Sequence, residues 1–245
     1  MEQSSLSSLF PDAAESEVAL VRYRAVRRRL RFLVVALALA PVLGYLIVGG
    51  SPSGLIVGYV NANESAAIAT LKNISSGQSQ LQASGALDVN GNGQGEYGFF
   101  AELAGAAPLR GTKVPLSQPV LSESFGNVVG GRVKRGGYWF QMFLPHTADG
   151  WTTELPAGGG GPEVAADGAE SLWICYAWPV ERGKTGNRAF FISQMGCVTT
   201  TNMANEVYAG GRAPLAGLSA FAVDGSKHVH AANSPDKRGN IWVVM

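Results

Sequence analysis

The chain is poor in charged residues and carries almost no net charge. Only 15% of its 245 residues are Asp, Glu, Lys or Arg, and the formal net charge is +1. Six of the 19 basic residues and four of the 18 acidic residues precede residue 51, which leaves 13 basic and 14 acidic residues after it. Nucleic-acid binding needs a basic patch or stripe, so this balance argues against a nucleic-acid partner.

Common catalytic motifs are also missing. The chain has no Gly-x-Ser-x-Gly nucleophile elbow. The Gly183–Thr185 tripeptide resembles the end of a phosphate-binding loop, but Trp178 stands where that motif needs its first glycine. His228 and His230 lack a fixed third ligand, so they are only a weak zinc signal. We therefore do not expect an enzyme.

Charged residues are absent from Phe32 to Gly50. A helix rises about 1.5 Å per residue, so roughly 20 apolar residues cross a hydrocarbon core of about 30 Å. Residues 30–50 therefore predict one transmembrane helix, preceded by a tail of residues 1–29. Six arginines lie between Arg22 and Arg31, and an excess of arginine marks the cytoplasmic flank. We expect the tail to be cytoplasmic and the chain after Gly50 to be outside the cytoplasm.

Two alternatives remain open for this apolar segment. A cleaved signal peptide would have an apolar core of about 7–15 residues that ends in a small-residue cleavage site. The core here is longer, and no clear site follows it. A buried core helix fits less well, because the segment is apolar on all sides and contains Pro41.

An amphipathic helix is expected after the span. Residues 51–62 contain Pro52 and Gly54, and they form either a linker or a helical continuation. From Asn63 onward, mainly apolar residues recur at spacings of three and four, which places them on one helix face. They are Ala67, Ile68, Leu71, Ile74, Gln78 and Leu81. The stripe is narrow, which favours packing on a sheet.

Side chains that carry oxygen alternate in the glycine-rich loop 88–98. Asp88, Asn90 and Asn92, followed by a glycine, match the first half of a calcium-binding loop. Phe99 stands where the bidentate glutamate of such a loop belongs. The candidate calcium ligands are Asp88, Asn90, Asn92, Gln94 and Glu96. The alternative is a turn in which Asp and Asn side chains bond to their own backbone.

Several short segments rich in aromatic and branched residues predict strands. They are residues 136–145, 171–178, 187–193 and 197–201, with shorter candidates at 221–223, 228–231 and 241–244. Cys175 and Cys197 lie on or next to neighbouring predicted strands and would close a loop of about 20 residues as a disulfide in an oxidising compartment. Two buried free thiols are the alternative.

The order of these segments from Asn63 to Thr200 resembles the type IV pilin-like proteins, close to the type II secretion pseudopilins. The run NESAAIATLK from Asn63 looks like the lower part of their long N-terminal helix. The pieces that look like the following loop and strands are Tyr97-Gly98, Ala101–Leu103, Gly137–Phe140, Trp173–Pro179, Thr185–Phe191 and Gly196. The chain departs from the family in having neither a short cleavable leader nor a glutamate within its apolar helix.

The resemblance implies an α+β fold, in which the transmembrane helix precedes an amphipathic helix packed on an antiparallel sheet. Residues 63–245 would form the extracytoplasmic domain, with a C-terminal β extension after Thr201. The resemblance further implies a membrane-anchored structural or accessory subunit of a pilus-like or secretion-type assembly in a bacterial inner membrane. Its partners would be the lipid bilayer and other envelope or pilin-like subunits, including further copies of itself. The alternative is a membrane-tethered module that binds a ligand or partner in the periplasm or outside the cell.

Overall fold

The structure, a computed structural model, describes residues 52–214 and 235–245 apart from 237, together with nine residues of helical backbone between Tyr23 and Ala40. The chain forms two compact units, Met1–Leu55 and Ile56–Met245. Most of the predicted tail and span, and the candidate strands 221–223 and 228–231, lie outside the described residues. In the part of the chain that the structure describes, no helix is long and apolar enough to cross a membrane.

Helix α2 (Pro52–Ser84) is the long helix of the larger unit. It begins at Pro52, so residues 52–62 are helical. Proline suits the first turn of a helix, because its missing N–H would have no intrahelical partner there. Five of the six residues of the predicted stripe are buried: Ala67 is 2% exposed, and Leu71, Ile74, Gln78 and Leu81 are fully buried. The sixth, Ile68, is half-buried and packs against the same core.

The strands form one antiparallel sheet in the order β1-β2-β4-β5-β6-β7, with β3 paired to β2. The strands are β1 (Val133–Arg135), β2 (Tyr138–Pro145), β3 (Trp151–Thr153), β4 (Ile174–Pro179), β5 (Ala189–Ser193), β6 (Thr199–Thr201) and β7 (Val243–Val244). The four longer predicted strands and the candidate at 241–244 are therefore confirmed. Three short helices lie in the connections: α3 (Phe100–Leu103), η1 (Glu123–Gly126) and α4 (Ala166–Ala169).

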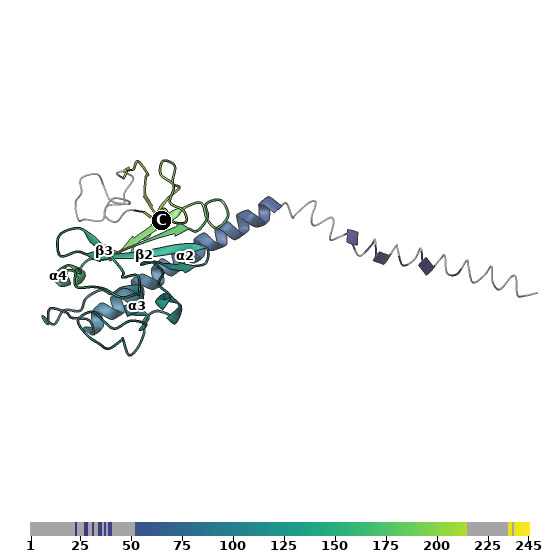
Figure 1. The fold of residues 1–245 in the computed structure, drawn as a ribbon. Helices are drawn as coiled ribbons and strands as arrows, with labels where there is room; N and C mark the ends of the chain where they lie inside the picture. The colour runs from purple at the N-terminus through teal and green to yellow at the C-terminus, as the bar shows by residue number, and fades with distance from the viewer. Residues whose placement is uncertain are drawn as a thin grey trace, which may run out of the picture. The chain divides into compact units, whose positions relative to one another are not determined.

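The central strands are buried on both faces, since every residue of β4 and β5 is buried. On one face, Cys175, Ala177 and Phe190 pack in a core with the stripe of α2. Figure 1 shows α2 running along the sheet. A strand buried on both faces reads as a continuous apolar run, which is the pattern of the segment Ile174–Pro179.

The C-terminal extension covers the second face of the sheet. Tyr208 and Trp242 pack there with Tyr176 and Phe191 in a separate core. Trp178 Nε1 donates to the Gly210 carbonyl at 3.0 Å and the Gly210 N–H donates to the Pro179 carbonyl at 3.1 Å, so both bonds join the extension to β4. Within the extension, Trp242 Nε1 donates to Asp236 at 2.9 Å. The α+β class is thus confirmed, with a helix on one sheet face and the C-terminal extension on the other.

Candidate functional site

The start of the amphipathic stripe is fastened to the turn between β4 and β5. Glu64 is 4% exposed, and its carboxylate accepts hydrogen bonds from the Asn187 N–H at 2.8 Å and from Arg188 Nε at 2.7 Å. Asn63 Nδ2 donates to the Thr185 carbonyl at 3.1 Å. The Asn63–Glu64 pair therefore positions α2 against the sheet.

A glycine makes this contact possible at the β1–β2 turn. Gly137 has a φ of 76°, and a Cβ there would lie 2.9 Å from Asn63 Nδ2 and 3.0 Å from the Thr185 side chain. The positive φ and the close approach both favour glycine. The β1–β2 turn, the β4–β5 turn and the start of the stripe thus meet at one end of the domain.

The Asp88 loop closes on itself through its own side chains. Asp88 accepts hydrogen bonds from the Asn92 and Gly93 N–H groups, and Asn92 Oδ1 accepts one from the Gln94 N–H at 2.8 Å. Asn90 and Asn92 donate their amide N–H groups to Glu170 at 2.9 and 2.8 Å. These bonds are those of the turn alternative.

Of the five candidate calcium ligands, Glu96 is the one that lies apart from this exposed loop surface. Its side chain is fully buried, and its carboxylate is 3.0 Å from Arg110 Nη2. A cation at the loop would have to displace the Asx hydrogen bonds and would lack this carboxylate. In the described part of the chain, no group of three or more His, Cys, Asp or Glu is arranged to hold a metal ion.

Glu96, Glu102, Arg110 and Glu154 form a buried polar cluster, here called the Glu–Arg cluster. Arg110 is 7% exposed and pairs with Glu96 at 3.0 Å and with Glu102 at 2.9 Å. Glu102 also accepts hydrogen bonds from the Phe99 and Arg110 N–H groups at 2.8 and 2.9 Å. Burial raises the pKa of Glu102, while Arg110 and these N–H groups act in the opposite direction.

Glu154 joins the start of α3 to the glycine run Gly158–Gly161. Its Oε1 accepts hydrogen bonds from the Ala101 N–H at 2.8 Å and from the Gly159 N–H at 2.9 Å. Its Oε2 is buried and has no hydrogen-bond partner among the described residues. Burial raises the pKa of Glu154 to about 7, because the charged form loses its hydration.

A cavity of about 300 Å³ opens beside Arg110. Its lining residues are Val89, Arg110, Gly111, Gly160, Gly161, Pro162 and Val164. A Cβ on Gly160 would lie 2.5 Å from Arg110 Cδ and 3.0 Å from the Phe99 ring, so only glycine fits there. The volume is at the lower end of the range for small-molecule pockets.

The predicted Cys175–Cys197 disulfide is absent, because both residues are free thiols. Cys175 is buried in β4 opposite Ile192, and Cys197 is exposed just before β6. Strand β5 lies between them, and neighbouring strands are about 4.8 Å apart. The two backbones are therefore roughly 10 Å apart, beyond the limit of about 7 Å between the Cα atoms of a disulfide. Of the alternative, two buried free thiols, Cys175 fits because it is buried, whereas the free thiol of Cys197 is exposed.

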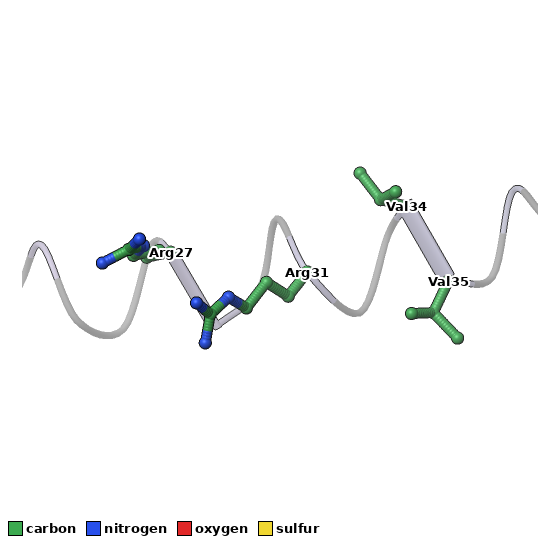
Figure 2. Close-up of a pocket in the computed structure, with 4 residues that line it drawn as sticks. All are labelled: Arg27, Arg31, Val34 and Val35. Atoms are coloured by element: carbon green, nitrogen blue, oxygen red, sulfur yellow. The ribbon is translucent and has the colours of Figure 1, made fainter.

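The N-terminal unit has a shallow groove lined by Arg27, Arg31, Val34 and Val35. Figure 2 shows the two arginines along the helical backbone on one side of the valines. These residues lie where the arginine cluster ends and the apolar run begins. The prediction of a transmembrane helix depends on this change from arginines to apolar residues.

Glu102, Arg110 and Glu154 were not among the site residues predicted from the sequence. Glu102 stands three residues after Phe99, a spacing at which glutamate often bonds the N–H at a helix start. Arg110 and Glu154 had no comparable signal, because their partners come from distant loops.

Comparisons of the chain with protein-family models, with curated proteins and with solved structures gave no match.

Proposed function

We propose that the protein is a membrane-anchored, pilin-like structural or accessory subunit of an envelope assembly. The observation that carries the proposal is the division of α2 into two parts with opposite exposure. From Asn63 to Leu81 its stripe is buried against the sheet, whereas Ile56, Val57 and Tyr59 are 50%, 57% and 56% exposed.

An exposed apolar stretch at the start of a long helix needs a covering surface. Fully burying one Val or Ile side chain stabilises a complex by roughly 1.5–3 kcal/mol, so covering these half-exposed side chains is worth a few kcal/mol. Contiguous apolar patches of this kind mark interaction sites in soluble parts of proteins. A neighbouring subunit that packs along α2 would supply the cover.

The test compares two valines of similar exposure. Val57 lies on the start of α2 and is 57% exposed, and Val114 lies in a loop and is 66% exposed. The full-length protein is purified in a mild neutral detergent, and its assembly state is measured by light scattering and electron microscopy. We expect the parent and Val114→Ser to form the same assemblies, and Val57→Ser to form smaller ones. Equal assembly in all three, or none in the parent, contradicts the proposal.

The binding-module alternative draws support from the cavity beside Arg110. A module of this kind would hold its ligand as a monomer, so Val57→Ser would leave ligand binding unchanged. Screening the full-length protein with small-molecule fragments by thermal shift tests this alternative. The substitution Gly160→Ala, which places a methyl group against Arg110, should abolish any shift that arises from the cavity.

A further inference from the structure

The charges of the larger unit are separated between its two ends. One end lies where the β1–β2 turn, the β4–β5 turn and Asn63 meet, and it is called the basic end below. Its cations are Arg132, Lys134, Arg135, Arg182, Lys184 and Arg188. The carboxylates near them are the buried Glu64 and the exposed Glu123 and Glu181. Three of the cations are exposed and three are half-buried, and the six exceed the carboxylates by three positive charges.

The opposite end lies beyond Ser84, where α2 stops. From Asn63 to Ser84 the helix spans roughly 30 Å at about 1.5 Å per residue. The loop carboxylate Asp88 lies there with Asp167 and Glu170, which Asn90 and Asn92 contact, and Glu163 is close by. The turn after β2 also lies at this end, because the Thr147 N–H donates to the Glu163 carbonyl, and it adds the exposed Asp149. With the exposed cation Lys113 nearby, the charge there sums to about four negative charges.

Several cations of the basic end are free to act on a partner. Arg188 pairs with Glu64 and Lys184 with Glu181. Lys134 and Arg132 instead lie over the half-buried Trp139 ring at 6.0 and 5.7 Å. Among the described residues, neither forms an ion pair with a carboxylate. The surface therefore presents positive charge and an aromatic ring together.

Apolar side chains accompany these charges. Trp139 lies among the cations, and Tyr59 is 56% exposed one turn of α2 before Asn63. Tyrosine and tryptophan suit the boundary between lipid and water, because each has an apolar body and a polar tip. Cations with interfacial aromatic residues fit a lipid surface better than a folded acidic partner.

We propose that the basic end docks on an anionic lipid surface and orients the domain on the bilayer. The proposal rests on the membrane attachment in the proposed function, since residues 51–55 alone separate the predicted span from this unit. Such a short tether gives the surface a high effective concentration, so weak contacts are sufficient. The attraction should be sensitive to salt, because exposed charges are screened beyond about 8 Å at physiological ionic strength.

The test uses the full-length chain in lipid bilayer discs that hold one copy each. One set of discs contains phosphatidylcholine alone, and in the other about a third of the lipid is phosphatidylglycerol, an anionic headgroup that attracts Lys and Arg. Hydrogen exchange is followed by mass spectrometry in peptides that cover residues 132–139 and 181–188. We expect exchange there to slow several-fold in the anionic discs, and high salt to reverse the effect.

Two double variants with equal loss of charge separate a docking surface from net charge. Lys134→Gln with Arg182→Gln removes two exposed cations of the basic end. Lys72→Gln with Lys113→Gln removes two exposed cations elsewhere. The first pair should abolish the protection in anionic discs, and the second pair should preserve it.

Each other outcome overturns the proposal. If the peptides are unprotected in both kinds of disc, the basic end does not dock on lipid. If they are protected to the same extent in both, anionic lipid has no role and the contact is an apolar insertion. Loss of protection in both double variants indicates net charge without a defined surface. Protection that requires more than one copy per disc assigns the basic end to a second copy of the chain. A chain that enters neither kind of disc refutes membrane attachment itself, which distinguishes that failure from failure of docking.

Discussion

The buried carboxyl group of Glu154 is expected to make the stability of the domain depend on pH. Its pKa is raised from 4.5 to about 7 by burial. Between these values the folded protein keeps the proton that the unfolded chain has lost, so folding stability falls as pH rises. The slope is about 1.4 kcal/mol per pH unit, and the total loss above pH 7 is about 3 kcal/mol.

The substitution Glu154→Gln removes the titration and keeps most of the geometry. The amide oxygen can still accept the N–H groups of Ala101 and Gly159, and the amide nitrogen takes the place of Oε2, which has no partner among the described residues. The free energy of unfolding should therefore change about 3 kcal/mol less between pH 4.5 and pH 8 in the variant than in the parent. Glu102 adds a pH dependence of the same sign, because its pKa is also raised, so the variant keeps part of the slope.

The assay is urea unfolding of the full-length protein in neutral detergent, followed by tryptophan fluorescence. Glu123→Gln is the matched control, because that side chain is exposed and forms no ion pair among the described residues. The control should follow the parent at every pH. A parent that becomes more stable as pH rises from 4.5 to 8, or a variant with the same pH dependence as the parent, would refute the reasoning.

Three further predictions concern single contacts. Glu64→Ala should lower the free energy of unfolding by about 1–3 kcal/mol in urea titrations, because the part-buried Asn187 N–H and the Arg188 guanidinium lose their acceptor; an unchanged midpoint would show that α2 does not depend on this contact. In the native protein a maleimide should modify one thiol, that of Cys197, and in denaturant it should modify both thiols, as counted by intact mass. If both thiols stay unmodified in denaturant without reductant, the two cysteines form the disulfide. Calcium at millimolar concentration should leave the melting temperature of the parent and of Asp88→Ala unchanged, because the oxygens of Asp88 and Asn92 already accept loop N–H groups; a rise in the parent alone would establish a calcium site.

The local patterns in the sequence predicted the main elements of the fold. The three- and four-residue spacing from Ala67 to Leu81 marks the face of α2 that the sheet buries. The strands were visible because their branched and aromatic residues are dense and are bounded by glycine and proline. Both signals depend only on neighbours in the chain.

Contacts between distant segments were outside the reach of such patterns. Nothing near Arg110 in the sequence indicates that it pairs with two buried glutamates, one of which was assigned to a calcium loop. The disulfide prediction failed for the same reason, since the spacing of Cys175 and Cys197 does not reveal that β5 lies between them. At Pro52 the sequence left two alternatives open, because a proline can either break a helix or begin one, and in the structure it begins α2.

The exposed start of α2 is expected to contact a neighbouring copy of the chain. The direct measurement is disulfide trapping in membranes, with Val57→Cys or Val114→Cys introduced into a Cys197→Ser background. A mild oxidant should convert Val57→Cys to covalent dimers, and Val114→Cys should stay monomeric. Monomers in both variants, or equal dimer formation in both, would contradict the account.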